Sequence, residues 1–297
     1  MKNRWILNLL LAALIGALAL VAIYKPGKKE DKQAIPLTAL ERDAIGRIQV
    51  ERPQGKALVL EKGERGWRLT QPLKARANRF NVDSLLRLAQ AETEGRFPAD
   101  TKALKQYGLD PPEARVRFDE EEVGIGASHP LKPLRYVLHK GQVHLVPAQR
   151  TRSAFNSYTD FISSRLFAAQ SRLKRIELPK QTLSLKDGAW QLKPEIEDLG
   201  TDATNDFVDE WRHARALSVD KYSGKRPRAH VKVVYTGPEG KEHKLRLGIL
   251  QYRPDFILYR PDEGLEYRFT EDTGKRLLEL KAPEKKKSDE QPATSNK

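Results

Sequence analysis

Apolar and polar residues alternate in short segments over most of the chain, a spacing typical of half-buried β-strands. Turn residues separate these segments, so neighbouring strands along the chain are expected to pair. Lys140-Gly141, between two such segments, predicts a two-residue hairpin turn in which glycine supplies a positive φ. The pattern predicts strands within residues 57–60, 67–69, 114–118, 122–126, 135–139, 142–146, 173–178, 183–192, 230–235, 243–250, 256–259 and 265–270.

Other segments place apolar residues three and four positions apart, which indicates helices with one buried face. The clearest of these can be capped by Asn78 or Asn81, and Asp83 in its first turn would complement the helix dipole. A shorter helix is expected to end at Gly108, where a left-handed residue is commonly needed. The predicted helices are the one carrying Val82, Leu85, Leu86 and Ala89, and four more near residues 100–107, 150–167, 204–217 and 272–280.

The same order of elements occurs twice. The recurring segments are 58–69 (LVLEKGERGWRL) with 183–192 (LSLKDGAWQL), and 123–146 with 247–269. Trp67 corresponds to Trp190 and Gly126 to Gly248, at offsets of 123 and 122 residues. Two distant landmarks that keep nearly one spacing indicate a duplicated fold unit. The predicted fold class is α+β, with two tandem similar units, each an antiparallel sheet packed with helices, and a cleft between them.

One segment ahead of these units is apolar throughout. Trp5–Tyr24 contains no charge, with Asn8 as its strongly polar residue, and twenty residues at about 1.5 Å each span roughly the 30 Å of a bilayer core. We expect a single-pass transmembrane anchor in the inner membrane, with the N-terminus in the cytoplasm and the body in the periplasm or outside. Flanking charges are nearly balanced, so this orientation rests on the short N-terminal tail. Ala17-Leu18-Ala19 resembles a cleavage site, and a cleaved signal peptide is the alternative.

The chain is therefore expected to have five parts. A transmembrane anchor (1–25) is followed by a polar linker (26–44), a first α+β repeat unit (45–170), a second α+β repeat unit (171–281) and a basic tail expected to be disordered (282–297).

The amino-acid composition excludes several kinds of functional site and indicates which ligands the surface attracts. Cysteine is absent, which excludes disulfides, thiolate metal sites, cysteine nucleophiles and an acylated lipoprotein cysteine. The net charge is +14, and without Lys2 and Arg4 the chain still has 52 basic against 40 acidic residues. Such a surface attracts anionic lipid or acidic glycan. Nucleic acid is not expected as a partner, because an exported domain would rarely meet it.

Three elements occur in an order that resembles the bacterial DUF4340 family. They are Trp67-x-Leu69-x-x-Pro72, then Tyr107-Gly108-Leu109-Asp110-Pro111, then Gly126 followed by the hairpin over 136–146. The resemblance covers residues 45–170 well and 173–280 as a weaker second copy that lacks the Tyr-Gly-Leu-Asp-Pro element. It implies a membrane-anchored, exported protein without an assigned activity. Relatives of this kind are often associated with ABC-type export or gliding-motility-like membrane systems.

The motif residues are expected to be structural. Trp67 and Trp190 should pack a strand pair onto a helix, and residues 107–111 should stop a helix with a hydrophobic anchor. The competing interpretation places Tyr107 and Asp110 on a lip that faces a partner. The complete set consists of Trp67, Pro72, Tyr107, Gly108, Leu109, Asp110, Pro111, Gly126, Trp190 and Gly248.

Candidate reactive groups are few. In the predicted hairpin His139 pairs with Gln142 and Val137 with His144, so both histidines share one face, which we interpret as a polar sheet face rather than half of a metal site. Ser128-His129 lacks the spacing of a nucleophile elbow. The acidic residues 119–122 are expected to form a solvated turn. No catalytic, cofactor-binding or metal-binding residue is predicted.

The best candidate contact for an anion or a partner is the basic loop with Lys225, Arg226 and Arg228. Arg165, at a predicted helix end, could equally satisfy carbonyl groups there. The leading prediction is a non-enzymatic, membrane-anchored periplasmic scaffold or partner-binding subunit of an envelope assembly, associated with an ABC-type exporter. The first alternative is a binder of an anionic envelope polymer or lipid, and the second is a hydrolase with an unrecognised site.

Overall fold

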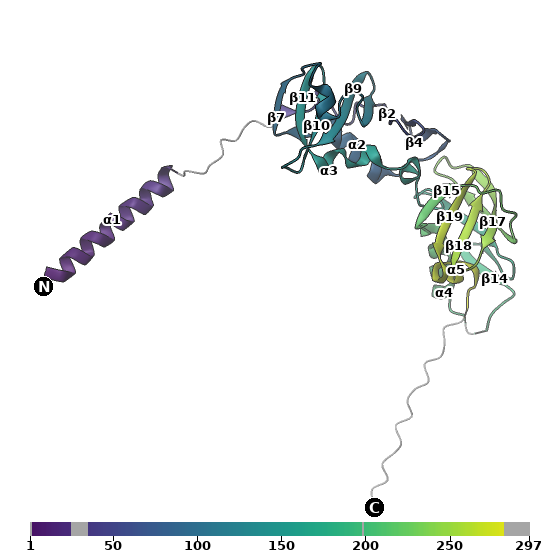
Figure 1. The fold of residues 1–297 in the computed structure, drawn as a ribbon. Helices are drawn as coiled ribbons and strands as arrows, with labels where there is room; N and C mark the ends of the chain where they lie inside the picture. Colours follow the sequence, from purple (N-terminus) through teal and green to yellow (C-terminus); the bar gives the residue numbers. More distant parts are fainter. Residues whose placement is uncertain (1, 25–34, 198, 282–297) are drawn as a thin grey trace, which may run out of the picture.

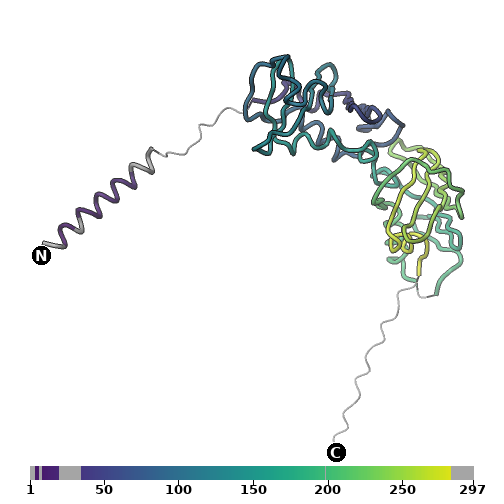
Figure 2. Tube along the Cα trace, viewed as in Figure 1, coloured from purple at the N-terminus to yellow at the C-terminus, as the bar shows by residue number. Residues whose placement is uncertain are grey.

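The structure, a computed structural model, describes residues 2–24, 35–197 and 199–281. It is mixed α+β and consists mainly of two antiparallel sheets, of nine and eight strands, that follow one another along the chain (Figure 1). The trace in Figure 2 shows the first sheet and its helices in blue and teal and the second in green and yellow, with one connecting segment between them. We call these parts the first and second unit.

The first unit contains the nine-stranded sheet, in the order β5-β4-β3-β2-β8-β9-β10-β11-β7. Its strands alternate between buried and exposed positions, as in β8, so one face lies on the hydrophobic core. The strands are β2 (Arg47–Glu51), β3 (Leu58–Gly63), β4 (Gly66–Gln71), β5 (Ala75–Arg76), β7 (Gly95–Pro98), β8 (Ala114–Phe118), β9 (Glu121–Ser128), β10 (Leu134–His139) and β11 (Gln142–Pro147).

The second unit contains the eight-stranded sheet, in the order β14-β13-β12-β16-β17-β18-β19-β15. Apart from β5, the two sheets connect their strands in the same order. The strands are β12 (Arg172–Glu177), β13 (Thr182–Lys186), β14 (Ala189–Lys193), β15 (Ser218–Lys221), β16 (Ala229–Thr236), β17 (Glu242–Gln251), β18 (Asp255–Arg260) and β19 (Leu265–Thr270).

One long helix packs on the core in each unit: α2 (Arg79–Ala89) in the first and α4 (Thr201–His213) in the second. A shorter helix follows the last long strand of each sheet: α3 (Ala148–Thr151) and α5 (Glu271–Leu278). Asn78 caps α2 by accepting a hydrogen bond from the backbone N–H of Phe80, and the predicted apolar face is buried. These features confirm the helix that the spacing predicts. Asp83 lies beyond the first turn and instead pairs with Arg42 and Arg79.

The register of the β10–β11 hairpin also confirms the sequence pattern. His139 lies opposite Gln142 and Val137 opposite His144. At the turn, Lys140 and Gly141 have φ values of 45° and 72°, so both residues adopt the left-handed conformation that a tight hairpin of this twist needs. The β3–β4 turn is shorter than predicted, because the strands continue to Gly63 and begin again at Gly66.

The helix predicted over residues 150–167 is wrong. The chain instead forms α3, then the 3₁₀ turns η2 (Arg152–Phe155) and η3 (Tyr158–Phe161). Asn156 and Ser157 adopt extended backbone angles, and Ser157 forms a capping box with Asp160, so polar side chains start a new turn where one long helix would have continued. The apolar residues of this segment reach the core from separate short turns.

Two other predicted helices are shorter in the structure. Residues 100–107 contain the 3₁₀ turn η1 (Leu104–Tyr107), and Gly108 ends it with a φ of 63°, as expected. The helix predicted over 204–217 ends at His213, because the next residues leave it to join the connecting segment and β15.

The described part of the expected linker packs against the first unit. β1 (Ile35–Pro36) pairs with β6 (Glu92–Thr93), and the backbone N–H groups of Leu37 and Thr38 donate to carbonyls at the end of α2. Leu37 and Thr38 are buried, so residues 35–44 belong to the first unit, which begins before the predicted boundary at residue 45. Residues 26–34 lie outside the described residues.

The N-terminal segment forms α1 (Lys2–Tyr24), a single helix of 23 residues. Its apolar side chains that the structure describes, from Trp5 to Leu18, are exposed. Among the helices of the described residues, none is long and apolar enough to cross a membrane. Residues 1 and 25 of the expected anchor and the tail 282–297 are outside the described residues.

Candidate functional site: the cleft between the two units

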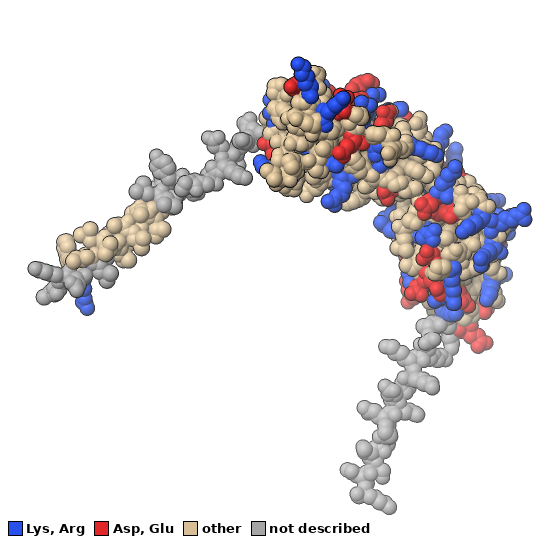
Figure 3. All heavy atoms as spheres, in the orientation of Figure 1, with Lys and Arg blue, Asp and Glu red and all other residues tan. Residues whose placement is uncertain are grey.

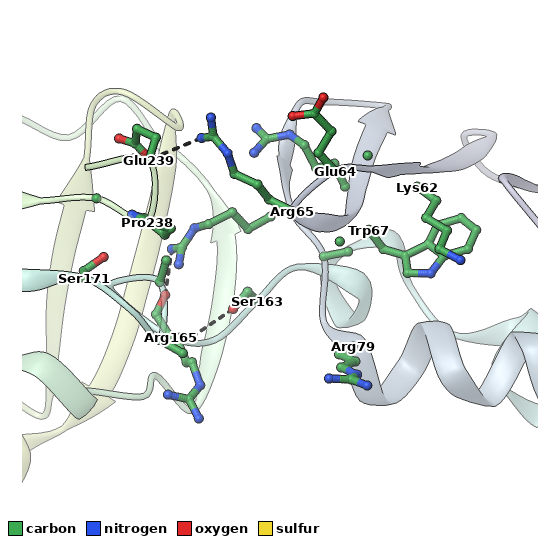
Figure 4. A pocket seen from close by; sticks show the side chains of 18 of the residues that line it. Lys62, Glu64, Arg65, Trp67, Arg79, Ser163, Arg165, Ser171, Pro238 and Glu239 are labelled. Carbon is green, nitrogen blue, oxygen red and sulfur yellow. Dashed lines mark hydrogen bonds and ion pairs between the residues drawn. The ribbon is translucent and has the colours of Figure 1, made fainter. Parts of the chain in front are cut away.

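A cleft of about 1080 Å³ lies where the two units meet. Its walls come from the β3–β4 hairpin, β5 and α2 of the first unit, the connecting segment 162–171, and the β16–β17 and β18–β19 turns of the second unit. Figure 4 shows Arg65 reaching from the first unit towards Glu239, with Trp67 on the side of the first unit and Arg165 and Ser171 on the opposite side.

Arg76 holds the two units together at this cleft. Its position follows from β5, which pairs with β4 at the edge of the nine-stranded sheet. The Arg76 Nε donates to Glu263 at 2.9 Å, and Nη2 donates to the carbonyl of Arg165 at 2.7 Å and to the hydroxyl of Tyr267 at 3.3 Å. One guanidinium therefore binds the β18–β19 turn and the connecting segment at once.

Arg260 completes this cluster from the second unit. It is 5 % exposed, donates to the carbonyl of Leu166, and lies 3.5 Å from Glu263 and 2.9 Å from Asp262. Burial disfavours its charge, but the two carboxylates outweigh that cost and hold its pKa above the ordinary value. We call Arg76, Arg260, Glu263 and Tyr267 the junction cluster. It is a set of paired charges and hydrogen bonds that joins the units.

Burial raises the pKa of Tyr267 above its ordinary value, and the charge of Glu263 adds to that effect. Tyr267 donates its hydroxyl hydrogen to Glu263, which requires the neutral phenol. Burial likewise raises the pKa of Tyr235, whose hydroxyl accepts a hydrogen bond from Arg260 at 3.4 Å. Both phenols therefore stay neutral at physiological pH and serve the junction cluster as hydrogen-bonding groups.

A second contact between the units lies at the rim. Arg65, at the tip of the β3–β4 hairpin, donates to Glu239 in the β16–β17 turn at 3.2 Å. His243 also contacts Glu239. The hydrogen bond from His243 is the main cause that lowers the pKa of Glu239, and Arg65 contributes in the same direction. Because Arg65 is two-thirds exposed, this pair contributes less than the junction cluster.

The cleft lining carries nine Lys and Arg residues against six Asp and Glu residues. Much of that charge is internally paired, in the two contacts above and in the pairs of Arg42 and Arg79 with Asp83. Among the described residues, Lys62, Arg68, Lys74 and Arg165 of the lining have no carboxylate within 4.0 Å, and the Lys62 Nζ donates to the backbone carbonyl of Asp43 at 2.7 Å. The cleft therefore has a positive excess that is available to a ligand.

Ser171 is an unpaired polar group in the same wall. It is 2 % exposed, and within the described part of the chain its Oγ has no hydrogen-bond partner. A buried hydroxyl without a partner costs free energy. The arrangement suits recognition of an anionic or polar group.

The sequence predicted a cleft between the units, and two residues that it singled out, Trp67 and Arg165, line that cleft, but it did not predict the junction cluster. Arg76 lies in a segment read as a loop, and Glu263 in a turn. The signal that could have found the cluster is Arg260, a charged residue at a position where the alternation of β18 points into the core.

The family-motif residues Tyr107 to Pro111 and Gly126 form a structural cluster away from the cleft lining. A Cβ on Gly126 would lie 2.3 Å from the carbonyl oxygen of Tyr107, so only glycine lets β9 approach this segment. Leu109 is buried, and the ring of Tyr107 lies 4.6 Å from that of Tyr136. Asp110 and Pro111 are exposed, and the backbone approach at Gly126 favours the structural interpretation.

The second unit repeats this contact with different residues. A Cβ on Gly248 would lie 2.6 Å from the Cγ of Pro227. The rings of Tyr222 and Tyr259 stack with centroids 3.7 Å apart. The loop that lacks the Tyr-Gly-Leu-Asp-Pro element therefore packs on its sheet through a tyrosine pair as well.

The remaining predicted residues lie at separate places. Trp67 and Trp190 are partly buried against the core, and Trp67 also lines the cleft. Pro72 is partly buried after β4. Lys225, Arg226 and Arg228 are exposed on the loop after β15, outside the cleft lining, so the structure does not bring them together with the candidate site.

The two histidines of the first hairpin are buried, at 7 % for His139 and 4 % for His144, which corrects the expectation of a polar sheet face. His139 lies 3.1 Å from Glu121, and burial lowers the pKa of His144, with the charges of His139 and Arg96 adding to the effect. Among the described residues, no group of three or more acidic, histidine or cysteine side chains could hold a metal ion.

The acidic run 119–122 contains a residue with a structural role. Asp119 has a φ of 50°, and its carboxylate accepts hydrogen bonds from the backbone N–H groups of Gly46 and Arg47 at 2.8–3.2 Å. Asp119 therefore connects the start of β2 to the β8–β9 turn. The prediction of a solvated turn is wrong for this residue.

Comparison with known proteins gives one family. No curated protein and no solved structure matches the chain. The model of the domain of unknown function DUF4340 matches residues 67–245, from Trp67 in the β3–β4 hairpin to the middle of β17. That match includes most of both units and covers more than half of the chain, and this protein therefore belongs to the DUF4340 family.

Proposed function

We propose that this protein is a non-enzymatic, membrane-tethered binding subunit of an envelope assembly, in which the cleft between the two units receives a partner. The observation that carries the proposal is the junction cluster, which holds two sheets together around a cleft with uncompensated positive charge. A rigid surface of this kind reduces the ordering cost of binding. We further propose that the partners are membrane proteins, as in an ABC-type exporter.

We infer that the two units arose by duplication. Their common strand order, their long helices at equivalent positions and the paired Gly126 and Gly248 contacts support this inference. Two related units packed side by side create a junction at which binding sites commonly lie.

We also propose that the N-terminal segment tethers the body to the inner membrane, with the N-terminus in the cytoplasm and the body outside it. The absence of a membrane span noted above concerns the described residues alone, whereas the full sequence of Trp5–Tyr24 contains no charged residue. A helix of 23 residues is about 35 Å long. Its described side chains are apolar and exposed, apart from Arg4 at its start, and Figure 3 shows this part of α1 almost free of charged atoms. Apolar side chains without a protein core to cover them favour lipid.

The chemistry of the cleft supports binding rather than reaction. A catalytic acid or base works best with a pKa near the working pH. The pKa values of Arg260 and Tyr267 are both moved away from neutrality, and each group is held by Glu263. Their perturbation is explained by the contact between the units.

A second candidate function, binding of an anionic envelope polymer or lipid, is favoured by the basic loop. Lys225, Arg226 and Arg228 are exposed, and Figure 3 shows clusters of Lys and Arg on the second unit. This function would use the loop surface, whereas the first would use the cleft, so variants of the two regions separate them.

Site-specific cross-linking tests the leading proposal. The chain contains no cysteine, so Arg79→Cys in the cleft and Leu131→Cys outside it each create a single labelling site. Both positions are about nine-tenths exposed, which makes them a matched pair. A benzophenone maleimide is attached in native membranes and irradiated, and the adducts are identified by mass spectrometry. We expect a defined membrane protein at position 79; equal yields at both positions would overturn the proposal.

The tether is tested with the same two variants. Intact cells are treated with a membrane-impermeant maleimide, and membranes are then washed with carbonate. Labelling at Leu131→Cys and retention in the washed membranes are expected. A body that is labelled only after lysis, or that is released by carbonate, would contradict the proposed location.

A further inference from the structure

We propose that the cleft between the units binds an acidic segment of a partner polypeptide, whose carboxylates contact Arg68, Lys74 and Arg165. This inference rests on the proposed function and names the chemistry of the partner. It uses three cationic side chains that line one cleft and come from β4, the loop before β5 and the connecting segment.

The cleft already shows how it recognises carboxylates. Arg65 and Arg76 of the first unit bind Glu239 and Glu263 of the second, at 3.2 and 2.9 Å. Arginine suits this role because its planar guanidinium presents several donors to a carboxylate. Acidic side chains of a partner would form the same kind of contact with Arg68, Lys74 and Arg165, which have no carboxylate of the described part of this chain close to them.

Arg68 has a particular need for such a partner. It lies directly opposite Arg76 in the β4–β5 pair, and like charges in that position repel. Arg76 is neutralised by Glu263, while among the described residues Arg68 has no carboxylate within 4.0 Å. A carboxylate placed over Arg68 would relieve this repulsion, so part of the binding free energy is available before any apolar contact forms.

Ser171 supplies an independent observation. Its hydroxyl is buried in the wall of the cleft without a partner among the described residues. Because its Oγ is not exposed, a peptide reaches it once the wall of the cleft shifts, and it can then donate to a carboxylate or carbonyl oxygen or accept from a peptide N–H. A buried hydroxyl without a partner is unfavourable, and a bound peptide would satisfy it.

The acidic residues of the lining favour a peptide over a dense polyanion. Asp43 and Glu64 lie in the same cleft, and they would repel a phosphate polymer or an anionic lipid surface. A peptide can place its carboxylates on the bases and its backbone N–H groups on these acids. The volume of about 1080 Å³ is at the upper end of ordinary ligand pockets, which is room for a short segment.

Fluorescence anisotropy with labelled hexaglutamate tests this inference. The full chain is kept in maltoside micelles, and hexaglutamine with the same label is the neutral control. We expect saturable binding of hexaglutamate that weakens as salt rises from 50 to about 300 mM, because exposed charges are screened over that range. Equal binding of hexaglutamine would overturn the inference.

Two matched triple variants locate the site. Arg68→Ala/Lys74→Ala/Arg165→Ala removes three of the nine cleft bases, and Lys225→Ala/Arg226→Ala/Arg228→Ala removes three exposed bases outside the cleft. We expect the first to raise the hexaglutamate Kd about tenfold and the second to change it less than about twofold. The reverse order would assign acidic ligands to the loop and would overturn the cleft inference.

Ser171→Ala tests the hydroxyl contact of Ser171 separately from the charge of the cleft. We expect a hexaglutamate Kd about threefold to tenfold higher, with thermal stability unchanged or slightly increased, because an unsatisfied buried hydroxyl is lost. Unchanged affinity would remove Ser171 from the inference. Circular dichroism and the thermal midpoint of each variant establish that it is folded before its affinity is compared.

Two further probes identify the ligand class. Tripolyphosphate and vesicles containing one-third anionic lipid are tested against the same variants. Stronger binding of either probe than of hexaglutamate at the cleft would overturn the inference in favour of a polyanion or a membrane. The Arg79→Cys cross-linking is repeated with Arg68, Lys74 and Arg165 replaced by alanine in the same chain. If the same membrane protein is cross-linked equally well, this inference fails while the proposed function stands. If no membrane protein is cross-linked, the proposed function itself fails.

Discussion

Arg76 and Glu263 are 187 residues apart in the sequence, yet the Arg76 Nε lies 2.9 Å from a carboxylate oxygen of Glu263. The two side chains are 21 % and 12 % exposed, so water screens this pair less than the surface pairs of the molecule. Arg76 also donates to two backbone carbonyls of the connecting segment. The relative position of the two units therefore depends on one arginine more than on any surface pair described above.

Replacing Arg76 tests that dependence. Arg76→Ala leaves the Glu263 carboxylate near Tyr267 and removes donors from the carbonyls of Arg165 and Leu166, and we expect a loss of about 2–4 kcal/mol in unfolding free energy. Urea unfolding followed by tryptophan fluorescence measures it. Arg79→Ala is the control, because that side chain is 92 % exposed, and we expect a change below about 0.5 kcal/mol.

The same substitution should loosen the contact between the units. Spin labels on Leu131→Cys in the first unit and Leu185→Cys in the second report the distance between them; both residues are exposed. We expect a broader distance distribution with Arg76→Ala than with Arg79→Ala. Identical distributions in the two backgrounds would show that Arg76 does not set the orientation.

Gly126 should not tolerate a side chain. A Cβ there would lie 2.3 Å from the carbonyl oxygen of Tyr107 and 2.8 Å from a methyl carbon of Leu109, so the backbone must move. We expect Gly126→Ala to lower the unfolding free energy by about 1–3 kcal/mol. Gly95→Ala is the matched strand control, since its nearest contact would be an ordinary 3.8 Å. A Gly126→Ala protein as stable as Gly95→Ala would contradict the close approach.

His144 should make stability depend on pH. Burial, with the charges of His139 and Arg96, lowers its pKa in the folded state below the ordinary value near 6.5. The unfolded chain then binds more protons below pH 6.5, so the stabilisation is fully present above pH 6.5 and is lost as pH falls towards the folded pKa. The loss is at most about 1.4 kcal/mol per pH unit for one proton.

Urea unfolding at pH 7.5 and 5.5 measures this effect. The decrease in unfolding free energy between those values should be smaller in His144→Gln than in the native chain. His213→Gln, at an exposed position on α4, serves as the control and should keep the native pH dependence. A pH dependence that His144→Gln leaves unaltered would exclude this histidine as its source.

Trp211 should hold α5 against α4. Its indole N–H donates to the carbonyl of Leu277 at 2.7 Å, and the side chain is fully buried. Trp211→Phe keeps most of the apolar contact but leaves that carbonyl without its donor, and we expect a loss of about 1–3 kcal/mol. Hydrogen exchange should become faster in residues 271–278 than in a Trp190→Phe control, whose indole is only partly buried. Equal exchange in both variants would argue against this role.

The strands were predictable because their signal is local. A period of two places every second side chain on the core, so residues 134–147 specify both their conformation and the His139–Gln142 register. The segment 150–167 shows the limit of the same reasoning. Its apolar spacing fits a helix, but Ser157 and Asp160 stabilise a new turn, and the tertiary core accepts apolar residues from several short turns.

By itself, the sequence determined the α+β class, the strand pattern and the membership of a family. These follow from local spacing and from residues near one another in the chain. Only the tertiary structure decided where Arg76, Arg260 and Glu263 meet and which bases of the cleft remain without a carboxylate. Those relations depend on the packing of two units whose contacting residues are nearly two hundred positions apart, and no local periodicity encodes such a distance.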